Sequence, residues 1–302
     1  MLPDPPFYFP LRHGRYDVAP GLIKFGKDLG GGEVDAHVFQ FDNTFGRFRD
    51  AKLASRREHI DKYVLASDLS DDVATEVSSF IAARLVEEHP ALFALEGNCG
   101  SIQAHAALTG ETVNIARGLQ NLDDLACQVQ EDLAIVRTSP DGKHWLSYAH
   151  VCLPNGWALS EKIGGSFAAV HEPVAGMAEM NRRGDEFVNV MIQATDGLVR
   201  FAWGITFDDE LNHHPDRLRT LFDPQRPRAF LRVERQTMWG FPQRGAALFT
   251  IRTYLYDCET LRRDPTTRDS LVAALRSMTP ESLVYKGIAS HADGLLAWLT
   301  SP

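Results

Sequence analysis

Apolar residues recur at three- and four-residue steps between Leu69 and Leu95, which is the spacing of one face of an α-helix. Ser70 or Asp71 can cap the N-terminus of this helix. Pro90 marks its expected end, because proline cannot continue a helix. This segment is the clearest helix in the pattern.

Two further helices are predicted in the first half of the chain. One runs from about Leu122 to Asp132 and leads directly into an apolar strand, Leu133 to Arg137. The other covers Phe45 to Tyr63, where basic residues recur at helical spacing and predict a solvent-facing charged surface. These basic residues are Arg47, Arg49, Lys52, Arg56, Arg57 and Lys62.

From residue 133 to residue 256, polar residues alternate with β-branched and aromatic ones, as is typical of strands. Turn signals at 140–142, 196–197 and 242–245 predict five or six strands in meander order, and therefore an antiparallel sheet. The strand segments are LAIVRT, HWLSYAHVCL, FVNVMIQAT, VRFAWGITF, AFLRVERQTMW and AALFTIRTYLY. A helical excursion interrupts them at 156–184, and the pattern returns to helix at about 265–300. The sequence thus predicts an α+β fold, with one domain and helical flanks favoured over two domains.

Composition adds limits on the class of protein. The chain has 302 residues, 44% of them hydrophobic and 24% charged, which is enough for a substantial core. Its net charge is −9 and no run of Lys and Arg occurs, which disfavours binding to nucleic acid or anionic membranes. The N-terminus lacks the basic and apolar regions of a signal peptide, and no membrane-length apolar run occurs, so we expect a cytoplasmic protein.

The cysteines predict packing rather than chemistry. They lie far apart without a C-x-x-C pair, which disfavours a zinc ribbon, a redox dithiol and a disulfide scaffold. They are Cys99, Cys127, Cys152 and Cys258. Cys99 and His105 suggest a thiol nucleophile, but no known signature surrounds them, and a buried thiol is the favoured interpretation.

Two other suggestive motifs also have structural interpretations. Residues 1–36 predict an irregular wrap, in which the glycine run Gly30–Gly32 lacks the helix that must follow a phosphate-binding loop. His213 and His214 precede Pro215 in a predicted loop and lack the usual spacing of metal ligands. Neither motif is carried forward as a site.

The last two strands carry several charged residues. A turn centred near Gln243 would place Glu234 opposite Arg252, Arg232 opposite Tyr254 and Gln236 opposite Thr250, all on one face. This polar face would suit carboxylates, because arginine binds them with two parallel hydrogen bonds. An exposed cross-strand ion pair explains the same residues equally well.

The segment 152–174, CLPNGWALSEKIGGSFAAVHEPV, combines residues able to move protons or bind a metal with rigid and small ones. His171 lies just before Pro173, which restrains the backbone and would hold the imidazole in one direction. A lone histidine cannot form a tetrahedral zinc site but suffices for haem, whose porphyrin supplies four nitrogens. From the residues alone, a structural histidine remains the favoured alternative. Glu161 and Lys162 suit either a polar helix start or proton transfer.

Four segments together resemble the haem-dependent oxidative N-demethylase family, in order from about Asp42 to the C-terminus. They are QEDLAIVR, the 152–174 segment, LRVERQTMWGFPQRGAALFTIRTYL and SLVYKG. The resemblance implies one haem-binding, PAS-like domain, with an N-terminal helical extension (about 1–120) and C-terminal helices (about 265–300). It also implies that haem b and O2 remove a methyl group from a secondary amine such as dimethylamine, releasing formaldehyde. A flavin and iron–sulfur reductase partner would supply electrons.

The resemblance also implies roles for individual residues. The histidine of the H-x-P-V motif is His171, the expected iron ligand. Residues expected to bind the cofactor are Arg232, Arg235, Arg252, Trp157 and Trp203, and those expected in catalysis are Lys162, Glu161, Glu234 and Tyr254. Glu234 would hold the substrate ammonium, while Lys162, Glu161 and Tyr254 would relay protons. Ala202 stands where an asparagine is expected, so the substrate here is expected to differ if that asparagine contacts substrate in relatives.

Two other functions fit the same features. One is a haem-containing PAS-like sensor or binding module without turnover, which an all-apolar surface beside the iron would favour. The other is a haem-free structural subunit of an amine-oxidising complex. A polar cluster beside the iron would favour the enzyme.

Overall fold

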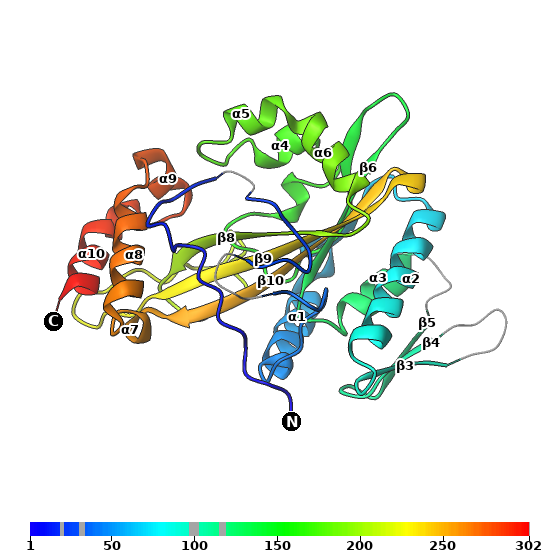
Figure 1. The fold of residues 1–302 in the computed structure, drawn as a ribbon, viewed down its shortest axis with the longest axis horizontal. Helices are drawn as coiled ribbons and strands as arrows, with labels where there is room; N and C mark the ends of the chain where they lie inside the picture. The colour runs from blue at the N-terminus through cyan, green and yellow to red at the C-terminus, as the bar shows by residue number, and fades with distance from the viewer. Residues whose placement is uncertain (19–20, 30–33, 97–102, 115–118, 302) are drawn as a thin grey trace.

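The computed structural model describes residues 1–18, 21–29, 34–96, 103–114 and 119–301 (Figure 1). Gly30–Gly32 and Cys99 lie outside the described residues, so the interpretations of these motifs stay predictions. Within the described part, no helix is long and apolar enough to cross a membrane.

A seven-stranded antiparallel sheet runs through the centre of the molecule, in the order β1-β8-β9-β10-β6-β7-β2 (Figure 1). Its strands are β1 (Ile23–Lys24), β2 (Val64–Ala66), β6 (Asp132–Thr138), β7 (His144–His150), β8 (Leu198–Thr206), β9 (Phe230–Phe241) and β10 (Ala246–Asp257). The predicted α+β class and antiparallel pairing are confirmed. A simple meander is not, because the last predicted strand, β10, pairs with the first, β6. The chain leaves β7 and crosses to β8 through the helical excursion.

The first part of the chain contributes helices and a small second sheet at one end of the molecule (Figure 1). The helices are α1 (Phe45–His59), a 3-10 turn (Ile60–Lys62), α2 (Asp71–Glu88) and α3 (Leu119–Ala126). The helix predicted from the 69–95 pattern is confirmed as α2, and α3 begins and ends earlier than expected. The small sheet, β3 (Phe93–Glu96), β4 (Gln103–Ala106) and β5 (Glu111–Asn114), is absent from the sequence prediction.

One basic residue of α1 is buried rather than solvent-facing. Lys52 is fully buried, and its ammonium donates to the carbonyl oxygens of Ala126, Val129 and Glu131. The prediction of a uniformly exposed basic face is therefore wrong at this position. Lys52 caps the chain after α3, where carbonyl groups lack helical donors.

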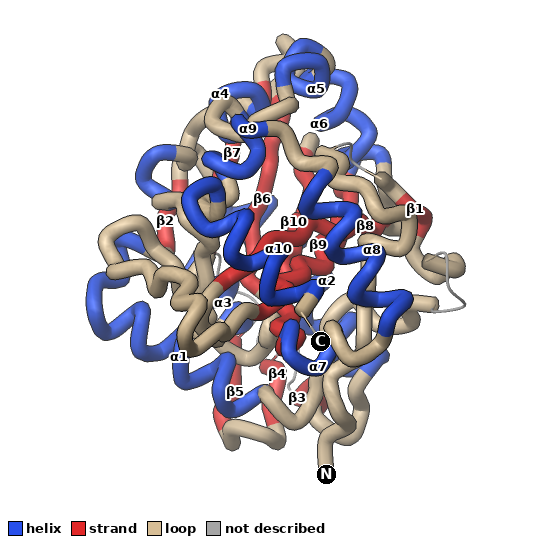
Figure 2. Tube along the Cα trace, turned by 90° about the vertical axis from the view of Figure 1, so that its left-hand side faces the viewer, coloured by secondary structure: helices blue, strands red, loops and turns tan. Residues whose placement is uncertain are grey.

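The excursion between β7 and β8 contains a 3-10 turn (Leu159–Glu161), α4 (Phe167–His171), α5 (Ala178–Arg182) and α6 (Gly184–Gln193). Figure 2 shows these helices grouped at one end of the sheet. The strand expected at 187–195 is wrong, because this segment forms α6. Its buried residues Val188, Met191 and Ile192 are spaced for a helix, and a short apolar run of this kind suits either structure.

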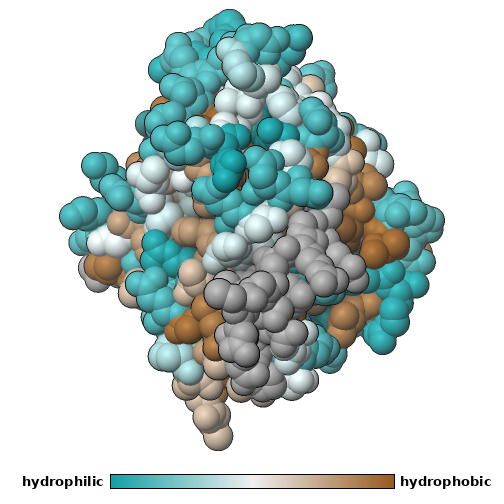
Figure 3. Space-filling view, turned by 90° about the vertical axis from the view of Figure 1, so that its right-hand side faces the viewer, coloured by the Kyte–Doolittle hydropathy of each residue, from teal (hydrophilic) through white to brown (hydrophobic). Residues whose placement is uncertain are grey.

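The C-terminal part returns to helix as predicted, with α7 (Cys258–Leu261), α8 (Pro265–Arg276), α9 (Pro280–Tyr285), a 3-10 turn (Ala289–His291) and α10 (Ala292–Thr300). Leucines of α8 and α10 pack with Leu231 and Val233 of β9. We call this side of the sheet the inner face, because α2 also packs against it, through Trp239 and Leu248. The opposite side, which the excursion covers, is the outer face. The surface around α2 mixes hydrophobic and hydrophilic patches (Figure 3).

The register of β9 and β10 differs by one residue from the prediction. A 3-10 turn (Pro242–Arg244) ends at Gly245 with φ of 55°, so that Ala246 pairs with Phe241 and Arg252 with Arg235. A shift of one residue moves every side chain of one strand to the other face. Arg232, Glu234 and Gln236 of β9 therefore lie on the outer face, whereas Thr250, Arg252 and Tyr254 of β10 lie on the inner face. The single polar face predicted from the sequence is wrong.

Candidate functional site

His171 ends the short helix α4 on the outer face of the sheet. Ser166 caps this helix by accepting a hydrogen bond from the amide of Ala169 (3.3 Å). The His171 ring packs against the tilted ring of Phe167, with 4.2 Å between ring centroids, and its Nδ1 lies 2.8 Å from the Phe167 carbonyl oxygen. Because a carbonyl only accepts, Nδ1 carries the proton and Nε2 keeps its lone pair. This is the tautomer and the second-shell contact of a metal-binding histidine.

Burial lowers the pKa of His171, and the nearby cations Arg200 and Lys162 lower it further. The imidazole is therefore neutral at pH 7 and available as a ligand. Lys162 is buried and Arg200, from β8, is largely buried, with an Nε that has no hydrogen-bond partner among the described residues. Neither cation has a carboxylate within ion-pair distance in the part of the chain that the structure describes. Buried cations without a partner are costly, and the usual resolution is an anionic ligand.

Glu234 provides the carboxylate of this face. Its Oε1 lies 3.6 Å from Nε of Arg232, and its Oε2 accepts a hydrogen bond from Gln236 (3.1 Å). The Arg232 guanidinium is fixed by the carbonyl oxygens of Leu211 (3.0 Å) and Leu153 (2.8 Å). Arg232 therefore acts mainly as a structural cation that orients Glu234.

Lys286, directly after α9, completes the polar cluster and was missed by the sequence interpretation. Burial lowers its pKa, while Glu234 raises it, so the ammonium lies within the field of that carboxylate. Its side chain passes over Gly204 of β8, where an added Cβ would meet Lys286 Cδ at 3.6 Å. The SLVYKG motif contains this lysine, but nothing in the motif alone indicates that α9 brings it to the sheet.

An apolar wall and an open pocket flank these charges. Trp157 packs with Ile163, Val170 and Phe249 against the buried cluster around Leu159, so the predicted tryptophan does lie on the outer face. A pocket of about 480 Å³ opens between residues 172–175, directly after His171, and α9, directly before Lys286. Its size is within the range of small-molecule sites.

Four predicted site residues lie on the inner face instead. Arg235 is fully buried and its Nε lies 2.5 Å from Asp35, while Arg252 lies 2.6 Å from Asp42. The Tyr254 hydroxyl donates to Gln40, and burial raises its pKa well above the usual range. Trp203 packs in the core against Tyr16, 5.5 Å between ring centroids. The N-terminal segment and the core occupy all four. Strand alternation turns Arg235 and Trp203 away from His171, and the register of β10 turns Arg252 and Tyr254 away.

Other expected groups are also separate from His171. Glu161 is exposed, in contrast to its neighbour Lys162. His213 is held by Asp208, with Nε2 2.7 Å from the carboxylate oxygen. His150 is fully buried beside Cys127 and Cys152, at 3.8 Å from each sulfur. Among the described residues, no group of three or more His, Cys, Asp or Glu side chains could hold a metal ion.

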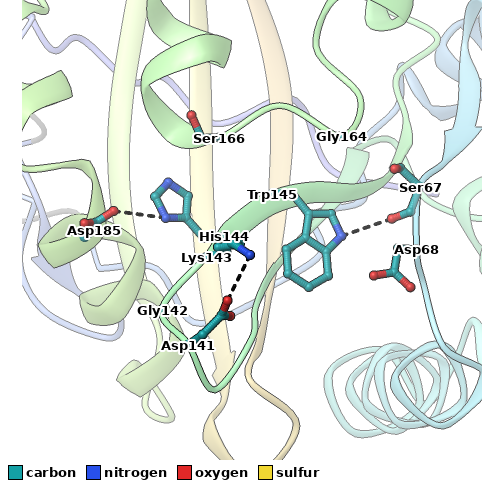
Figure 4. A pocket seen from close by; sticks show the side chains of 10 residues that line it. All are labelled: Ser67, Asp68, Asp141, Gly142, Lys143, His144, Trp145, Gly164, Ser166 and Asp185. Atoms are coloured by element: carbon teal, nitrogen blue, oxygen red, sulfur yellow. Dashed lines mark hydrogen bonds and ion pairs between the residues drawn. The ribbon is translucent and has the colours of Figure 1, made fainter.

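A second pocket lies beside the β6–β7 hairpin, with a volume of about 650 Å³ (Figure 4). His144 lies 3.2 Å from Asp185 and Trp145 donates to the Ser67 carbonyl (3.1 Å), as Figure 4 shows. None of the predicted site residues lines this pocket. The candidate functional site is therefore the polar cluster around His171 on the outer face.

The arrangement around His171 combines a neutral imidazole with a free lone pair, unpaired cations and one oriented carboxylate. Such a set fits a large anionic cofactor that needs one axial ligand, as haem does. A family model, described as haem-dependent oxidative N-demethylase, alpha subunit-like, matches residues 33–296. On this match the chain belongs to the haem-dependent oxidative N-demethylase alpha subunit-like family.

Proposed function

We propose that the protein binds haem b on the outer face of the sheet and uses it to demethylate a small secondary amine of the dimethylamine type. The observation that carries the proposal is the His171 ring, whose Nδ1 is occupied by the Phe167 carbonyl while Nε2 has no hydrogen-bond partner among the described residues. Arg200 and Lys162, the two cations that lower the pKa of His171, are suited to the two propionates of haem. The family membership supports the haem requirement.

We also propose that the whole chain is one PAS-like domain. Five strands lie in the order β7-β6-β10-β9-β8, and the helical excursion connects the second strand in sequence to the third. That order supports the PAS-like assignment. Elements from both ends of the chain pack on the same inner face, which supports one domain rather than two.

Haem, when bound, supplies the dioxygen chemistry, and the protein supplies binding, orientation and protons. One N-methyl carbon leaves as formaldehyde when the carbinolamine collapses, and a proton returns to the nitrogen. One oxygen atom enters the formaldehyde, while two electrons from a flavin and iron–sulfur reductase and two protons reduce the other to water. Glu234 orients the amine nitrogen, because its carboxylate is a natural counter-ion for an ammonium.

The polar cluster beside His171 supports an enzyme over a non-catalytic haem sensor. Among the described residues, Glu234 contacts only Arg232 and Gln236 at hydrogen-bond or ion-pair distance, and Lys286 has no carboxylate at that distance. A sensor would require only an apolar pocket and an axial ligand. We therefore retain the demethylase as the proposed function.

An absorption spectrum of the purified protein tests the cofactor. We expect a Soret band for the wild type, and its loss or displacement in His171→Ala. An unchanged spectrum in the variant would reject His171 as the ligand. Formaldehyde release from dimethylamine with a surrogate reductant then tests the reaction, and a haem-loaded protein without release would reject demethylation of this amine.

A further inference from the structure

Three buried or half-buried cations of the outer face have no carboxylate within ion-pair distance among the described residues: Lys162, Arg200 and Lys286. A fourth cation, Arg219, is exposed, and its guanidinium lies beside Gly287. Haem brings two carboxylates, and Lys162 and Arg200 are the two cations that act on the His171 pKa. With one propionate paired to Lys162 and the other to Arg200, Lys286 is the buried or half-buried cation that still lacks an anionic partner in the part of the chain that the structure describes. Its only described contact to a charged or aromatic partner at short range is the ring of Tyr285, 5.6 Å from Nζ.

Lys286 and Glu234 approach the same place from different elements. Lys286 reaches over β8 at Gly204, where an added Cβ would lie 3.9 Å from Nζ. Gly204 pairs with Arg232, and Ala202, two residues before it, pairs with Glu234. The lysine ammonium thus lies above the strand pair that carries the glutamate. Ala202 leaves this part of the face without a large side chain.

Charge at this place disfavours a simple alkylammonium. Glu234 is already compensated by Arg232, and the unpaired Lys286 would repel a second cation. A ligand with both an ammonium and a carboxylate would satisfy both residues without adding net charge.

We propose that the site selects N-methylated amines that carry a carboxylate, of the N-methyl amino acid class, with Lys286 binding the carboxylate and Glu234 the ammonium. This inference rests on the proposed demethylase function and names its substrate class. It makes Lys286 a specificity-determining residue that contacts substrate.

The decisive comparison uses N-methylglycine and dimethylamine with the haem-loaded protein. We expect formaldehyde release with a kcat/KM at least about tenfold higher for N-methylglycine, because one charge-assisted hydrogen bond is gained. Lys286→Met should remove this preference by raising KM for N-methylglycine, with a smaller change in kcat and no rise in KM for dimethylamine. Lys286→Arg should retain the preference. Lys143→Met is the matched control, since Lys143 is exposed and paired with Asp141.

Turnover of dimethylamine in preference to N-methylglycine would overturn the inference and leave the demethylase intact. If neither amine is turned over, the proposed function fails, and calorimetric binding of N-methylglycine to wild type and to Lys286→Met still decides whether the carboxylate site exists. A haem propionate is the alternative source of the carboxylate that Lys286 binds. Titration with haem and with its dimethyl ester separates the sources: weaker binding of haem, but not of the ester, by Lys286→Met would assign Lys286 to a propionate and overturn the inference.

Discussion

Arg200 provides the sharpest test of the outer face, because a ligand-binding cation and a structural cation respond to removal in opposite ways. Its guanidinium is largely buried, its Nε has no described hydrogen-bond partner, and burial lowers its pKa. Desolvation of an ion costs several kcal/mol, and an apolar replacement of similar volume often stabilises a protein by about 1–4 kcal/mol. Arg200 keeps some solvent contact, so we expect the lower end, about 1–2 kcal/mol, for Arg200→Met in the haem-free protein.

This gain corresponds to a rise of about 2–4 °C in Tm, at roughly 2 °C per kcal/mol for a chain of this size. The same variant should bind haem about 10- to 100-fold more weakly, because it loses one charge-assisted hydrogen bond to a propionate. Thermal unfolding of the haem-free protein and haem titration measure the two effects. Their opposite signs identify a cation that is kept for a ligand.

Arg235→Met is the matched control, on the neighbouring strand and the other face. Arg235 pairs with Asp35 at 2.5 Å and donates to the carbonyl oxygens of Val38 and His37. Its removal leaves a buried carboxylate unpaired, which costs about 3–5 kcal/mol. A loss of stability in Arg200→Met comparable to that in Arg235→Met would refute the reasoning, because Arg200 would then have a structural partner.

Three further predictions concern titration, close packing and the buried lysine. Because the pKa of His171 lies below its ordinary value, haem affinity should stay constant as the pH falls from 7.5 to 6.5. Below the pKa of His171 the affinity should drop by about tenfold per pH unit, since protons compete for Nε2. A haem titration in which the affinity already declines above pH 7 would contradict this prediction. Gly240→Ala should lower the free energy of unfolding by about 3 kcal/mol or more, because the added Cβ would lie 2.1 Å from the Ile192 carbonyl oxygen. Chemical denaturation measures this loss, and a cost below about 1 kcal/mol would show that α6 does not pack so closely against β9. Lys52→Met should lower the free energy of unfolding by about 3–5 kcal/mol in the same assay, because the buried carboxylate of Asp132, 4.0 Å away, loses its cation. An unchanged free energy of unfolding would exclude the buried ion pair.

Local patterns predicted the elements whose residues interact mainly with near neighbours in sequence. The four-residue spacing of Val73, Val77 and Ile81 predicts a helix with one buried face, and α2 has it. Alternation in β6 and β8–β10 predicted their strands for the same reason. The family resemblance, rather than the residues alone, singled out His171 as the expected iron ligand, and this role stays a prediction.

The tertiary structure decided what depends on one residue of register or on contacts between distant segments. Gly245 ends a turn one residue longer than expected, so Arg252 and Tyr254 lie on the inner face against a segment some 200 residues away in sequence. The apolar run in α6 was compatible with strand or helix, and only packing against β9 distinguishes them. Lys286 lies over β8 only because α9 folds back towards this strand. Periodicity fixes which side of an element is apolar, whereas long-range packing fixes which elements face each other, and a functional site needs both.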